Sequence, residues 1–72
     1  PALNDTYGWI EYRRGNFADA LRYLEPAAAG LPEDALVQFH LGMTYAALDR
    51  DEDAARLLEQ ALALAKCNGN YH

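Results

Sequence analysis

The sequence predicts an all-α fold of two helix-turn-helix units, and three observations support this prediction. The stretch from Gly8 to Ala27 recurs, residue type by residue type, 34 positions further on. A fixed period of this length with small residues in register is typical of helical repeat arrays. The chain also has no serine and few β-branched residues, which favours helix almost everywhere. The matched pairs are Gly8 and Gly42, Ala20 and Ala54, Leu24 and Leu58, and Ala27 and Ala61.

Length and charge limit the classes of function. A chain of 72 residues forms one small domain, which buries only about 60% of its unfolded surface. The net charge is −5, with acidic residues in excess in both halves. Because no basic patch exists, nucleic acid and anionic membrane surfaces are unfavourable partners. No apolar run approaches the roughly 20 residues of a membrane span, so membrane insertion is not expected.

The first unit begins with a helix predicted over residues 3–14. Gly15 ends it, since glycine readily takes the left-handed conformation found just past a helix end. Asn16 is the expected N-cap of the second helix, with Asp19 as an imperfect capping-box partner. The apolar stripe of that second helix starts at Phe17.

Proline and glycine punctuate the middle of the chain. Pro26 lacks a backbone N–H and crowds the preceding turn, so a kink or an early helix end is expected there. Gly30 and the residues after it form the second turn, and either Pro32 or Glu33 is predicted to start the third helix. Glu33 and Asp34 suit the positive end of that helix dipole.

The second unit is predicted as helices over residues 35–48 and 52–66. Asp49 stands where Gly15 stood, and aspartate tolerates the left-handed conformation better than most residues. The last residues show no pattern and are expected to be flexible. The predicted boundaries are a domain over residues 1–66, with repeats over 3–32 and 35–66, and a tail over 67–72.

These residues resemble the tetratricopeptide repeat over nearly the whole chain. The matching residues are Tyr7, Gly8, Gly15, Asn16, Phe17, Ala20, Leu24, Ala27 and Pro32 in the first copy, and Leu41, Gly42, Tyr45, Ala54, Leu58 and Ala61 in the second. The resemblance implies four antiparallel helices in a short right-handed α-solenoid that acts as a protein-interaction scaffold. The chain also looks like the C-terminal repeats of bacterial multi-repeat proteins of envelope and exopolysaccharide-export systems. It is therefore expected to be part of a larger bacterial protein, in the cytoplasm or, with a slight preference, at the cell envelope.

Some positions depart from the family pattern. Asn4 and Gln38 stand where the family often has tryptophan, and Glu11 and Asp51 replace aromatic residues. Each departure is expected to weaken local packing without breaking the pattern.

The resemblance places a ligand groove on the inner helices. Helical spacing puts two rows of residues on that side, and aromatic and methionine side chains are enriched in protein interfaces. The rows predicted to contact a partner are Asp5, Trp9, Tyr12 and Arg13, and Phe39, His40, Met43 and Ala47. The alternative is that Trp9 and Phe39 merely cover a small core. Because acidic and apolar residues stand where some family members clamp a C-terminal carboxylate, an apolar or basic peptide is the expected ligand.

Other polar residues are weaker candidates. His40 could be a ligand, a base or a pH switch. It has no Cys, His or Ser partner at a workable spacing, so a neutral groove-lining histidine is favoured. The acidic run 49–53 lacks the glycine and ligand spacing of a calcium loop, and Cys67 is a lone thiol. His72 belongs to the tail. No metal, cofactor or catalytic residue is predicted.

Two functional hypotheses lead, and catalysis, the third, is not expected because no nucleophile elbow, phosphate loop or paired-histidine motif is present. The first is a scaffold module that binds a peptide. The alternative is a structural unit that self-associates through uncapped repeat ends, since helical arrays usually need three or more repeats. The apolar residues predicted for such self-association are Leu57, Leu58, Leu62 and Leu64.

Overall fold

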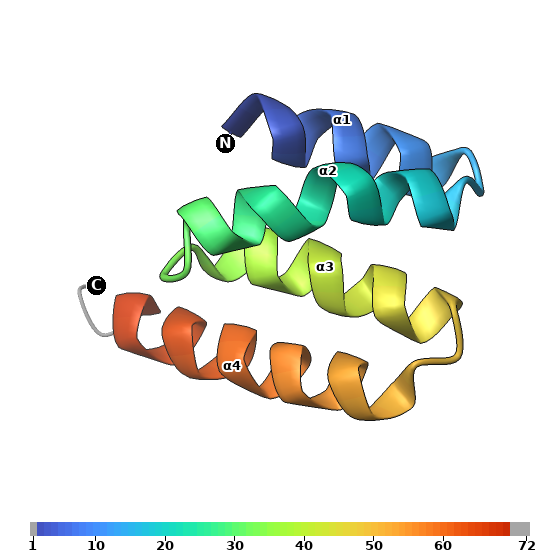
Figure 1. Cartoon of the computed structure of the whole chain (residues 1–72). Helices are drawn as coiled ribbons and strands as arrows, with labels where there is room; N and C mark the ends of the chain where they lie inside the picture. Colours follow the sequence, from blue (N-terminus) through green and yellow to red (C-terminus); the bar gives the residue numbers. More distant parts are fainter. Residues whose placement is uncertain (1, 70–72) are drawn as a thin grey trace.

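Four helices make up the part of the chain that the computed structural model describes, residues 2–69 (Figure 1). They are α1 (Ala2–Arg13), α2 (Phe17–Gly30), α3 (Ala35–Ala47) and α4 (Asp51–Gly69). Each helix runs antiparallel to the one before it and packs against it, and α1 also touches α3 (Figure 1). Residues 2–69 contain no strand, so the predicted all-α fold of two helix-turn-helix units is confirmed.

The same turn ends the first helix of both units. Gly15 has φ +84° and Asp49 has φ +62°, both in the left-handed region. In each turn the N–H of the next residue donates to a helix carbonyl five positions back, at 2.9 Å, which satisfies an acceptor that the helix end would leave free. The prediction that Asp49 takes the place of Gly15 is therefore confirmed.

The structure decides between the two starts predicted for the third helix. α3 begins at Ala35, because the Asp34 carboxylate accepts from the backbone N–H groups two and three positions ahead, at 3.0 and 3.2 Å. The prediction that Pro32 or Glu33 starts this helix was wrong, since both residues lie in the turn before the cap.

The predicted side-chain cap of α2 is also wrong. Asn16 stands at the N-cap position with φ −90° and ψ 69°, and its side chain accepts no cap hydrogen bond. Its amide instead donates to the Glu11 carboxylate at 3.1 Å. Asp19 forms an ion pair with Arg22 at 3.8 Å. The side chain of Asn16 therefore ties the turn to α1.

Proline does not shorten α2, which continues through Pro26 to Gly30, so the predicted early end was wrong.

A second proline, Pro32, affects the hydrogen bonding at the end of α2. Pro32 lacks the N–H that would otherwise bond to the carbonyl of Ala28, and the Gln38 amide donates to that carbonyl at 3.3 Å. Gln38 is buried, so its departure from the family pattern, expected to weaken packing, instead links α3 to the end of α2.

The core lies between the helices and is built from small and medium apolar residues. Gly8 packs against Leu24, and Gly42 packs against Leu58, at equivalent positions of the two units. Tyr45, Val37 and Leu41 bring α3 into the same cluster. The buried apolar residues are Ala20, Leu24, Ala27, Ala28, Val37, Leu41, Tyr45, Ala54 and Ala61.

Helix α4 extends further than expected. It runs to Gly69, three residues past the predicted domain boundary at 66, and so overlaps the predicted tail. Residues 70–72, which include His72, lie outside the described residues, as does the side chain of Cys67.

Candidate functional site

Aromatic rings from two helices stack on the side of the molecule where α1 meets α3. The ring of Trp9 lies 4.6 Å from that of Tyr12, centroid to centroid, and the two planes differ by 6°. The ring of His40, on α3, lies 4.0 Å from Trp9 at an angle of 14°. Near-parallel rings at these distances attract each other, and this attraction adds to the stabilisation that comes from the buried area alone. Three of the predicted inner-face residues therefore form one stack.

An acidic residue holds this stack. Nδ1 of His40 lies 2.8 Å from the Asp5 carboxylate, and the two side chains are only 9% and 13% exposed. An ionised carboxylate can only accept, so Nδ1 carries the proton. Both residues are among those predicted for the inner face, but their pairing was not predicted, and His40 was expected to line a groove rather than be buried. The repeat gives no signal for this pairing, because a period relates residues at the same position of different units and not residues in contact.

The other predicted inner-face residues have different surroundings. Arg13 and Ala47 are exposed, and Met43 is half-buried. Phe39 is 42% exposed, and its ring centroid lies 6.2 Å from that of His40. We call the whole predicted set the Trp9 face. Its members are Asp5, Trp9, Tyr12, Arg13, Phe39, His40, Met43 and Ala47.

A second surface, an open apolar groove of 580 Å³, lies between α3 and α4. It combines Phe39 of the Trp9 face with Leu58 and Leu62 of the predicted self-association set. The other two leucines of that set lie elsewhere: Leu57 packs against the core, and Leu64 is half-buried without lining the groove. We call this surface the α3–α4 groove. The lining residues are Ala35, Leu36, Phe39, Leu58, Ala61, Leu62 and Ala65.

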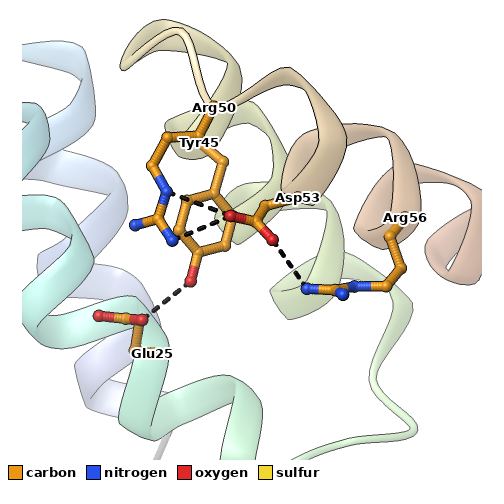
Figure 2. A network of polar contacts seen from close by, with 5 residues as sticks. All are labelled: Glu25, Tyr45, Arg50, Asp53 and Arg56. Carbon is orange, nitrogen blue, oxygen red and sulfur yellow. Dashed lines mark hydrogen bonds and ion pairs between the residues drawn. The ribbon is translucent and has the colours of Figure 1, made fainter.

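A polar network joins α2, α3 and α4 on a further side of the molecule (Figure 2). The Tyr45 hydroxyl donates to the Glu25 carboxylate at 2.8 Å, and the Arg50 guanidinium lies 4.4 Å from the centre of the Tyr45 ring. Asp53 accepts from Arg50 and from Arg56, at 2.9 Å each. Burial and the hydrogen bond to Glu25 raise the pKa of Tyr45 above its ordinary value near 10.

This pKa shift predicts a loss of stability at alkaline pH. The unfolded chain loses the Tyr45 proton near the ordinary pKa of about 10, while the fold retains it, so the free energy of unfolding falls as pH rises from there to the raised pKa. Tyr45→Phe should flatten this fall and cost about 1 kcal/mol at neutral pH through the lost hydrogen bond. Urea unfolding followed across this pH range measures both effects. Tyr23→Phe is the matched control, and parallel curves for wild type and Tyr45→Phe would contradict the prediction.

The described residues offer little to a metal or a membrane. Among them, no three His, Cys, Asp or Glu side chains are arranged to hold a metal ion. In the acidic run 49–53, two arginines occupy the Asp53 carboxylate. Within residues 2–69, no helix has the length and apolar character needed to cross a membrane.

Comparisons with known proteins agree with this architecture. The tetratricopeptide repeat family model matches residues 11–72. The chain is 52% identical over 42 residues to TPR repeat-containing protein PA4667 of Pseudomonas aeruginosa, a match that covers 58% of this chain and 7% of that protein. The chain thus spans a small part of its bacterial relative. No solved structure gives a significant match. Four helices packed in sequence, the 34-residue period and the family match together show that this chain belongs to the tetratricopeptide repeat family.

Proposed function

We propose that the Trp9 face binds a segment of another protein, and that this segment is apolar or basic. Tetratricopeptide repeats are generally non-catalytic protein-interaction scaffolds, so a protein partner follows from the family. The residues of the Trp9 face define the chemistry of the segment that would fit it.

The observation that carries the proposal is the Tyr12, Trp9 and His40 stack held by Asp5. Trp9 is half-buried, so part of its indole is fixed by the stack and part is accessible to a ligand. A ring that is already immobilised loses little conformational entropy on binding, which favours aromatic anchors in interfaces. The stack is therefore suited to hold an apolar side chain.

Charge supports the second part of the proposal. The chain carries a net charge of −5, and Asp5 lies beside the stack. Like charge disfavours an acidic segment through electrostatic repulsion. Arg13 is the one cation of the Trp9 face, and a single cation does not form a clamp for a carboxylate.

The test uses peptides selected on this chain from a displayed random library. The chain has a single tryptophan, so a shift in its fluorescence reports binding at the Trp9 face. Trp9→Ala is expected to weaken the selected peptides about thirtyfold, or about 2 kcal/mol, by calorimetry. Selected sequences should be depleted in Asp and Glu.

Tyr23→Ala is the matched control, because Tyr23 is 40% exposed and lies outside the Trp9 face. Circular dichroism shows whether both variants keep their helices. Peptides that bind Trp9→Ala as tightly as wild type would refute the assignment, as would a selection that yields no peptide at all.

A further inference from the structure

The imidazole of His40 is held at one edge and on one face, and it is open at its other nitrogen. Nδ1 donates to Asp5 at 2.8 Å, and the ring is stacked on Trp9 with 4.0 Å between the centroids. Nε2 makes no hydrogen bond to a described residue, and within residues 2–69 no buried side-chain nitrogen or oxygen lacks a partner. Nε2 therefore belongs to the small part of the side chain, 9%, that reaches the surface.

The hydrogen bond to Asp5 decides what this open nitrogen can do. A neutral imidazole carries one proton, and the carboxylate holds that proton on Nδ1, so Nε2 keeps its lone pair and accepts. Linked hydrogen bonds polarise one another, and the negative charge of Asp5 behind the ring makes Nε2 a better acceptor for a positively charged donor. The Trp9 face thus presents one fixed acceptor beside its aromatic stack.

We infer that His40 is a specificity-determining residue of the Trp9 face: Nε2 accepts a hydrogen bond from an arginine or lysine of the bound segment, and protonation of His40 abolishes this contact. The inference rests on the proposed function, because it names the polar contact that accompanies the apolar one. The Phe39 ring, 42% exposed, lies 6.2 Å from the imidazole, centroid to centroid. Its π face is a second attraction for the same cation.

Acid should remove this acceptor. Histidine is the side chain that ordinarily changes charge between about pH 5 and 8. A second proton on His40 goes to Nε2, which then donates instead of accepting, while Nδ1 keeps its hydrogen bond to Asp5. The pair also changes from one net negative charge to none, so its attraction for a cation falls. A segment with arginine or lysine at this place should therefore bind more weakly at pH 5 than at pH 8.

The charged groups of the neighbouring helices leave this pair by itself. Helix α1 presents Asp5 to the imidazole, and its exposed Arg13 is the other charged residue of the Trp9 face. On α2, Glu25 accepts from Tyr45, and on α4, Asp53 accepts from two arginines. A change of charge on the imidazole therefore acts through Asp5 and through the ligand.

The tautomer of His40 tests the first step without any ligand. In a His72→Gln variant of the full chain, His40 is the single histidine. The nitrogen chemical shifts of its ring at pH 8 distinguish a proton on Nδ1 from a proton on Nε2. The expected result is a proton on Nδ1, because Asp5 accepts it. A proton on Nε2 would overturn the inference, since this nitrogen would then have no lone pair to offer.

Peptides selected on the chain at pH 8 from a displayed random library test the second step. The probes are those that Trp9→Ala weakens, made without histidine and with blocked ends. They should carry an arginine or lysine whose replacement by alanine weakens binding about tenfold, as for a hydrogen bond to a charged group. Calorimetry should show an about tenfold loss for the cationic peptide between pH 8 and pH 5, and no loss for its alanine version.

Two substitutions separate the two nitrogens of the imidazole. In His40→Asn the amide stands near the place of Nδ1, so it can donate to Asp5 but offers no acceptor in place of Nε2. In His40→Gln the amide reaches the place of Nε2 and accepts there without titrating. His40→Asn should weaken the cationic peptide about tenfold at pH 8, whereas His40→Gln should bind it equally at both pH values. Tyr23→Ala, outside the Trp9 face, should keep the wild-type pH dependence.

The inference and the proposed function can fail separately. Peptides that Trp9→Ala weakens, but that bind equally at pH 8 and pH 5, would overturn the inference and leave the Trp9 face as a binding site. A pH dependence that persists in a helical His40→Gln variant would do the same. If circular dichroism shows that the His40 variants are unfolded, the cationic and alanine peptides on the wild-type chain decide the question. Peptides that bind Trp9→Ala as tightly as wild type would refute the Trp9 face, and the inference with it.

Discussion

Leu24→Ala is expected to lower the free energy of unfolding by about 2–5 kcal/mol, the range for removing a buried leucine side chain. Leu24 has no exposed area and contacts Gly8 across the interface between α1 and α2. A domain of this size has a total stability of only about 4–11 kcal/mol, by the usual value per residue. The loss is therefore a large fraction of the total stability, and urea titration followed by circular dichroism measures it.

Leu62→Ala provides the matched control, because it makes the same chemical change at an exposed position of α4. Its effect should stay within about 0.5 kcal/mol, as for most surface substitutions. Equal losses at Leu24 and Leu62 would show that the core is not where the structure places it.

Gly8→Ala should also destabilise the fold, by about 1–3 kcal/mol, the usual cost of overpacking. A Cβ atom at this position would lie 2.5 Å from Cγ of Leu24, which is far inside van der Waals contact. Alanine gains up to about 1 kcal/mol of helix propensity over glycine, but Leu24 is enclosed on all sides and cannot move aside. Thermal and urea unfolding of the variant measure the net loss.

Gly42, the residue equivalent to Gly8 in the second repeat, provides a comparison for this prediction. At Gly42 a Cβ atom would lie 3.0 Å from the Leu58 side chain, which is half-buried and borders the open α3–α4 groove. Leu58 can shift, so the propensity gain should make Gly42→Ala close to neutral. If Gly42→Ala were the more damaging of the two substitutions, this account of the packing would be wrong.

A double variant sharpens the comparison. Leu24→Ala opens space at the point where Gly8→Ala adds a methyl group, so the two changes should compensate each other in part. Residues in contact commonly show coupling energies of about 0.5–3 kcal/mol in such cycles. Additive effects would indicate that the two residues do not share this space.

The α3–α4 groove combines residues that were predicted for two separate sites. Phe39 was predicted for one partner site and Leu62 for another, yet both line the same groove. Helical periodicity assigns each residue to a side of its own helix, but it does not give the angle between helices. The packing of α3 against α4 decides which sides face each other and which remain open.

What the sequence by itself determined is the helical repeat and the conformation of the turn inside each unit. The 34-residue period put Gly8 and Gly42 at the same position of the two units, and it predicted that Asp49 would repeat the left-handed turn of Gly15. These features depend on a residue's own conformational freedom or size, which its place in the pattern reveals.

What only the tertiary structure decided are the polar pairings between helices. His40 meets Asp5 across 35 residues of sequence, and Gln38 donates to the Ala28 carbonyl that Pro32 leaves without a partner. A hydrogen bond forms only within a few tenths of an ångström and a limited angle. Repeat spacing places such groups on facing sides, but whether they meet depends on how the helices pack.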